Sequence, residues 1–78
     1  MITKAELEAA LRQELPGVDF DAGRPLTEAG LFSLNLLMTV TMIYGRWRIS
    51  IPPTEFKAAN FASVDSIFAL AKRYEGGK

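Results

Sequence analysis

Three stretches of this chain carry apolar residues at intervals of three or four positions, and this spacing constrains the fold more than any other feature. The interval is that of an amphipathic helix, whereas a half-buried strand would alternate at every second position. The stretches cover residues 3–13, 33–46 and 63–74. The one alternating segment, 49–51, is very short and ends at two prolines. The sequence therefore predicts an all-helical fold.

Local signals mark the ends of the first and last helices. Thr3 and Glu6 have the spacing of a capping box, and the proline at position 16 cannot continue a helix. Ser63 is placed to cap the last helix. The residues expected to face the core are Leu7, Ala10, Leu11 and Leu15 in the first helix and Val64, Ile67, Leu70 and Ala71 in the last.

A long loop over residues 18–31 joins the first helix to the second. Such loops are usually functional or packed by their own side chains, and Val18, Phe20 and Leu26 are candidates for that packing. Farther along, residues 54–59 are predicted to form a short helix capped by the threonine at its start.

A chain of 78 residues is one domain, and we place it at residues 1–75, followed by a flexible tail at 76–78. The domain is predicted to contain three main helices and one short helix, with the long loop between the first and second helices. Strand signals are weak.

The composition excludes several classes of function. Nine basic and nine acidic residues cancel, which leaves no basic surplus for nucleic acid. The chain has no cysteine and no histidine, so it lacks a thiolate nucleophile, the commonest general base and the commonest metal ligand. The longest apolar stretch, 31–44, is too short for a bilayer, which needs about 20 residues. We expect a monomeric cytoplasmic protein that is not an enzyme, holds no metal, binds no nucleic acid and does not insert into membranes.

The second helix is apolar nearly all round. Its core stripe is predicted at Leu36, Val40, Ile43 and Trp47. Further apolar residues are Leu34, Leu37, Met38 and Met42, of which Leu34, Met38 and Met42 are expected to lie away from that core. The narrow polar strip is Asn35, Thr39 and Arg46. Because so small a domain cannot bury a helix on every side, we expect an exposed apolar face that begins beside Ser33. A larger core and a dimer interface are the alternatives.

Ser33 taken alone is a helix cap. It has no histidine to activate it as a nucleophile. A phosphate attached to it, however, would lie among free backbone N–H groups at the positive end of the helix dipole. The position therefore suits a phosphoester acceptor that another enzyme modifies.

The residues around Ser33 and the order of the elements resemble the acyl carrier protein family, the phosphopantetheine carriers. The run LTEAGLFSL at 26–34 is similar to the family's loop, which ends in a glycine, two residues and the Ser-Leu that opens the second helix. Further similar runs are YGRWRISIP at 44–52, EF at 55–56 and NFASVDSI at 60–67. The resemblance covers nearly the whole chain and implies an acyl-carrier-like four-helix bundle.

The resemblance also implies a function. Ser33 would bear a covalent 4′-phosphopantetheine, whose thiol holds acyl or aminoacyl cargo as a thioester. Leu34, Leu37, Met38 and Thr41 would match the family's partner-facing positions. The implied partners are a phosphopantetheinyl transferase, a cargo-loading ligase or transferase, and downstream enzymes of a specialised biosynthetic pathway.

Two features depart from the family's pattern. Phe32 stands where the family usually has aspartate before the serine. The second helix has no acidic residue; Met38 and Tyr44 occupy commonly acidic positions, and Arg46 and Arg48 follow. We expect a dedicated partner bound by apolar contact. The alternative is a carrier-like interaction module without a prosthetic group, which would bind its partner through the same apolar face.

Overall fold

The computed structural model describes residues 1–21, 23–31 and 33–75, and at Ser33 it describes the backbone only. The α-helices are α1 (Lys4–Glu14), α2 (Ser33–Trp47) and α3 (Val64–Tyr74). The 3₁₀ helices are η1 (Leu26–Glu28), η2 (Pro53–Glu55) and η3 (Ala58–Phe61). No β-strand occurs in these ranges, so the predicted all-helical class is confirmed. The tail predicted at 76–78 lies outside the described residues.

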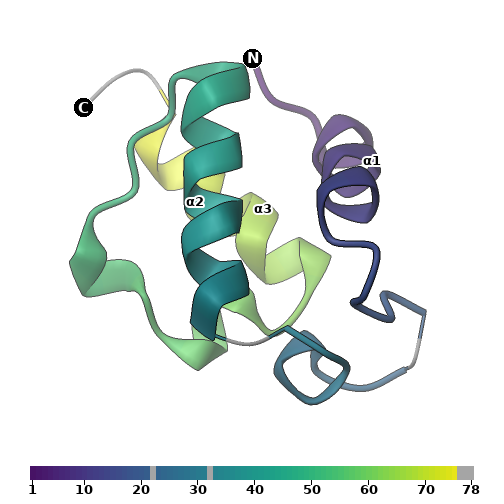
Figure 1. Cartoon of the computed structure of the whole chain (residues 1–78). Coiled ribbons are helices and arrows are strands. Elements are labelled where there is room, and N and C mark those ends of the chain that lie inside the picture. The colour runs from purple at the N-terminus through teal and green to yellow at the C-terminus, as the bar shows by residue number, and fades with distance from the viewer. Residues whose placement is uncertain (22, 32, 76–78) are drawn as a thin grey trace.

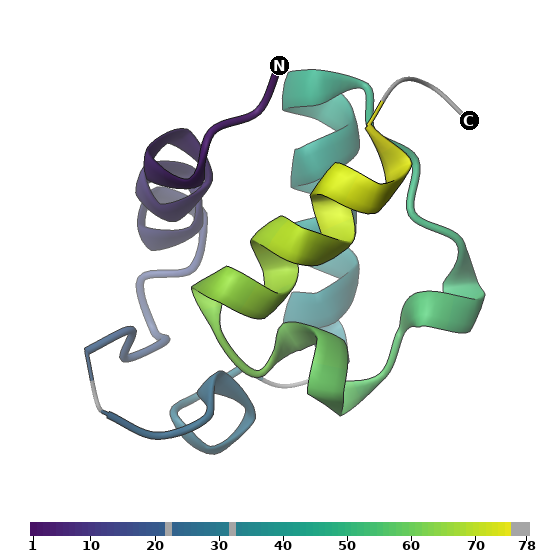
Figure 2. The same cartoon turned by 180° about the vertical axis from the view of Figure 1, so that it is seen from behind.

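The α-helices form two layers around one core. Figure 1 shows α2 in front of α3 with α1 beside them, and Figure 2, seen from behind, brings α3 to the front. The Cα atoms extend only 17 Å along the shortest axis. Helices pack about 8–10 Å apart, so this thickness holds two layers but not three. Of the described segments, none crosses the side of α2 that faces the viewer in Figure 1.

Local interactions start α1 as the sequence predicts. The Thr3 Oγ1 accepts a hydrogen bond from the Glu6 N–H at 3.2 Å, and the Glu6 carboxylate accepts one from the Thr3 N–H at 3.2 Å. The helix ends at Glu14, two residues before the proline at position 16. All four residues predicted to face the core from this segment are buried: Leu7, Ala10, Leu11 and Leu15.

The last helix also begins where expected. The Ser63 Oγ accepts a hydrogen bond from the Ser66 N–H at 3.0 Å, which caps α3. Three of its predicted core residues, Ile67, Leu70 and Ala71, are buried, and the fourth is half-buried. The alternation at 49–51 is also present, because the two isoleucines are buried and the serine between them is exposed.

The long loop packs with its own side chains, as predicted. Val18 and Leu26 are buried, and Phe20 packs against the core. The loop also contains η1, which the sequence pattern does not reveal. The Leu26 N–H donates to the carbonyl oxygen of Ala62 at 2.7 Å, so η1 is tied to a segment far away in the chain.

The predicted short helix at 54–59 is wrong in its extent and its cap. Two separate 3₁₀ turns, η2 and η3, occupy this region. The cap residue of η2 is Pro52, with no side-chain hydrogen bond, and Thr54 lies inside the turn. Pro53 fits the first position of a helix because it needs no N–H partner there, which moves the start back by one residue.

Candidate functional site

The core side of α2 follows the predicted stripe. Ile43 is fully buried, and Leu36, Val40 and Trp47 are partly buried against the core. Met42, which was expected to lie away from this stripe, is buried as part of the core. That expectation is therefore wrong: Met42 lies three positions after the buried Thr39, on the same side of the helix, and its flexible, unbranched side chain can reach the core from there.

Thr39 does not belong to a polar surface strip either. It is only 1% exposed, and its hydroxyl donates to the carbonyl oxygen of Asn35 at 2.7 Å. A threonine hydroxyl that bonds the carbonyl four residues earlier in its own helix can be buried without an unsatisfied donor. The sequence alone did not distinguish this buried threonine from an exposed one.

The outward side of α2 carries an exposed stripe, which we define as Leu34, Leu37, Met38, Thr41 and Tyr44. The exposed fraction is 69% for Leu34, 53% for Leu37, 41% for Met38 and 49% for Tyr44. Thr41 is also exposed. Their separations of three, four and seven positions place them on one side of the helix. The exposure expected for the predicted partner-facing residues is confirmed, while their binding role stays a prediction.

A groove runs along one edge of the exposed stripe, between α2 and the end of α1. One part, of about 480 Å³, is lined by Leu37, Met38 and Thr41 of the stripe and by Glu14 of α1. A second hollow, of about 310 Å³, is also lined by Glu14 and Met38 and continues to Gly30 at the end of the loop. The two hollows share Glu14 and Met38 in their walls and therefore lie next to each other, the second one toward the start of α2.

Two wall residues of this groove were missed by the sequence reasoning. Glu14 comes from α1, and its place beside α2 depends on how the two helices pack. Gly45 also lines the groove and is exposed, with no atom within 4 Å of where a Cβ would stand. A glycine inside a helix costs stability relative to alanine. Gly45 within the predicted second helix was therefore the one signal in the sequence for a special position on this side of the helix.

Ser33 is the first residue of α2, and the exposed stripe begins at the next position. Its side chain, like the whole of Phe32, lies outside the described residues. The backbone that leads to it is held at Leu31, which is buried and whose N–H donates to the Leu26 carbonyl oxygen at 2.9 Å. The start of α2 is therefore anchored to the loop immediately before it.

The carboxyl end of α2 is basic. Arg46 reaches Glu14 at 3.3 Å, a distance at the weak end of the hydrogen-bond range. The Arg48 guanidinium lies over the Tyr44 ring, 5.5 Å from its centre. Arg48 has a positive φ of 57°, and its N–H donates to the Tyr44 carbonyl oxygen at 2.8 Å, which ends the helix. Of the described carboxylates, none pairs with Arg48.

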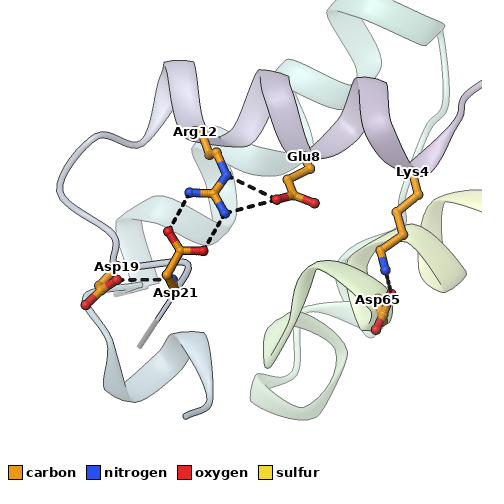
Figure 3. A network of polar contacts seen from close by, with 6 residues as sticks. All are labelled: Lys4, Glu8, Arg12, Asp19, Asp21 and Asp65. Atoms are coloured by element: carbon orange, nitrogen blue, oxygen red, sulfur yellow. Dashed lines mark hydrogen bonds and ion pairs between the residues drawn. The ribbon is translucent and has the colours of Figure 1, made fainter. Parts of the chain in front are cut away.

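A second polar cluster joins α1 to the long loop (Figure 3). The Arg12 guanidinium donates to Glu8 and, through two nitrogens at 3.0 and 2.8 Å, to Asp21. These bonds lower the pKa of Asp21 and raise that of Arg12, in each case chiefly through the hydrogen bond between them. The Asp21 N–H in turn donates to Asp19. Because Arg12 bonds both to Glu8 of its own helix and to Asp21 of the loop, the cluster holds the loop against α1.

The described part of the chain offers no metal-binding constellation. It contains no group of three histidine, cysteine, aspartate or glutamate side chains placed to hold a metal ion. Among the same residues, no helix is long and apolar enough to span a bilayer.

Comparison with known proteins gives no family: no protein-family model and no curated protein matches the chain. The relation to acyl carriers therefore stays a prediction from the sequence resemblance.

Proposed function

We propose that the protein is a cytoplasmic carrier of acyl or aminoacyl intermediates, held as a thioester on 4′-phosphopantetheine attached to Ser33. In this proposal the domain is an acyl-carrier-like bundle, with the η2–η3 segment in place of the short helix. The observation that carries the proposal is the placement of the exposed stripe, which begins directly beside Ser33 at the start of α2.

The start of α2 is chemically suited to a phosphodiester. The first backbone N–H groups of an α-helix have no partner within the helix, and the helix dipole is positive there. The first turn of α2 contains no acidic residue that would repel the phosphate. Ser33 would hold the group, and the backbone N–H groups of the first turn would face its charge.

The chain's own contribution is position and recognition. The thiol of the attached arm would supply a thioester, from which the cargo transfers readily because a thiolate is a good leaving group. The residues of the exposed stripe would orient partner enzymes at the same end of the helix, and those partners would provide the catalytic groups. The implied partners are a phosphopantetheinyl transferase, a loading ligase or transferase, and enzymes that use the cargo.

The test is the intact mass of the protein after co-expression with a broad-specificity phosphopantetheinyl transferase. We expect the mass to increase by one phosphopantetheine group. Ser33→Ala should abolish the increase, whereas Ser50→Ala, a change at an exposed serine outside the helices, should leave it intact. An unmodified protein with several different transferases would contradict the proposal.

The second candidate is a carrier-like interaction module that has no prosthetic group. It is favoured by Phe32 in the position before the serine and by a surface stripe that is suited to binding with or without an arm. Once a partner is identified, this module predicts that Ser33→Ala leaves binding intact while Met38→Glu abolishes it. The carrier predicts that Ser33→Ala is sufficient to remove function, because the arm can no longer be attached.

A further inference from the structure

The charge beside the exposed stripe that has no described ion-pair partner is positive, since the one carboxylate in the wall of the groove, Glu14, is paired with Arg46. No aspartate or glutamate occurs within α2, and its dipole makes the amino end positive. At the carboxyl end, Arg48 lies beside the exposed ring of Tyr44 without a described carboxylate partner. Arg46 is only weakly held by Glu14. A surface that packs on this stripe therefore meets apolar side chains with Arg48 at the carboxyl end and, in the unmodified chain, the positive end of the helix dipole at the amino end.

A second copy of the chain is a poor occupant of this surface. If two α2 helices packed in parallel, Arg48 of one copy would approach Arg48 of the other. If they packed antiparallel, each Arg48 would approach the positive amino end of the other helix. Like charges at short range oppose association in both arrangements.

The backbone at Arg48 adds an independent observation. A positive φ disfavours a residue with a Cβ atom, and glycine is the usual choice for this position after a helix. The chain instead places an arginine there, with its guanidinium held over Tyr44 at the edge of the stripe. The strained backbone is consistent with a role for this cation at the surface.

We propose that the exposed stripe docks on a partner protein that is apolar opposite Leu34, Leu37 and Met38 and that carries carboxylates opposite Arg48. The inference rests on the proposed function only in assuming that this stripe is a docking surface. An anionic lipid surface fits less well, because such binding usually needs a cluster of about four to eight basic residues, and the described α2 end has two.

The experiment uses two synthetic amphipathic helical peptides with the same leucine face. One carries glutamates at the polar positions of one end, and the other carries lysines there. Binding to the isotope-labelled full chain is followed by backbone amide chemical shifts. We expect the acidic peptide to bind about three- to fivefold more tightly at low salt, with shifts along the stripe, and the difference to shrink in high salt.

Charge-reversal variants provide the matched controls. Arg48→Glu should invert the preference for the acidic peptide, whereas Arg24→Glu, a change at an exposed loop arginine, should leave it unchanged. Equal binding of the two peptides, or shifts outside the stripe, would overturn the proposal. Dimerisation through the stripe in sedimentation, or binding to anionic vesicles without binding to the acidic peptide, would overturn it as well.

The two proposals can fail separately. The peptide experiment uses the unmodified chain, and Ser33→Ala should not change its result. A negative mass experiment with a positive peptide experiment would leave an acidic-partner module without an arm. The opposite pair of results would leave a carrier whose partner does not use Arg48.

Discussion

The carbonyl oxygen of Gly17 lies where a side chain at Gly30 would have to go: a Cβ there would stand 2.8 Å from that oxygen. Gly30 also has a φ of 115°, which residues with a Cβ rarely adopt. This contact brings the end of the loop against the turn after α1, three residues before Ser33.

Gly30→Ala should therefore be strongly destabilising. We expect a loss of about 2–4 kcal/mol in the free energy of unfolding, from backbone strain and overpacking together, measured by urea denaturation. Gly23→Ala is the control, because Gly23 has a positive φ of 74° but nothing within 4 Å. It should cost only about 1 kcal/mol. Equal losses in the two variants would show that the contact with Gly17 has no energetic weight.

Gly45→Ala should have the opposite effect. Gly45 lies inside α2, and a Cβ there would meet no atom within 4 Å. Alanine restricts the unfolded chain and favours the helix, so we expect a gain of about 0.5–1 kcal/mol. The urea midpoint would rise. A fall in stability would contradict the open space that the structure places beside this residue.

Substitutions at two residues of α2 test which side of the helix contributes to the core. Ile43→Ala removes a fully buried side chain and should cost about 2–5 kcal/mol. Leu37→Ala removes a side chain that is 53% exposed and should change stability by no more than about 0.5 kcal/mol. Urea denaturation of both variants makes the comparison. A large loss at Leu37 would mean that the stripe is part of the core.

Glu55 should make stability depend on pH. Its carboxylate accepts a hydrogen bond from the Tyr74 hydroxyl and contacts Asn60 and Arg73, each at 3.1 Å. Its pKa is lowered, chiefly by the Tyr74 hydrogen bond. A lowered pKa stabilises the fold above the pKa of the unfolded chain, and the stabilisation is lost as pH falls through the pKa of the folded protein.

Glu55→Gln should therefore be less stable than the native chain at about pH 7, and the gap should close below about pH 4. Urea denaturation across this range measures it. Glu28→Gln, at an exposed glutamate outside the cluster, is the control. A gap that stays constant with pH would show that ionisation of Glu55 does not stabilise the fold.

The elements that were predictable are those specified by neighbours in the chain. The Thr3–Glu6 capping box and the Ser63 cap involve residues three positions apart, so the local sequence is sufficient to identify them. The exposure of Leu34, Leu37 and Met38 was also predictable, because a thin domain cannot cover a helix on every side.

The sequence-based predictions missed or misplaced features that depend on contacts between residues far apart in the chain. η1 is held by a bond from Leu26 to Ala62, and η2 is anchored through Glu55 to α3. Neither partner is visible from the sequence nearby. Met42 and Thr39 were misplaced because helical spacing gives an angle around an axis but not how far the core extends around that axis.

The sequence by itself determined that the chain is helical, where two of its helices begin, and that Ser33 stands beside an apolar helical run, because these depend on local hydrogen bonds and spacing. Only the tertiary structure decided that Thr39 and Met42 lie on the buried side of α2, where the groove beside the helix runs, and that Arg48 lies over Tyr44. These features depend on the packing of α1 and α3 against α2 and on the backbone turn that ends α2, and neither is encoded by the helix's own pattern.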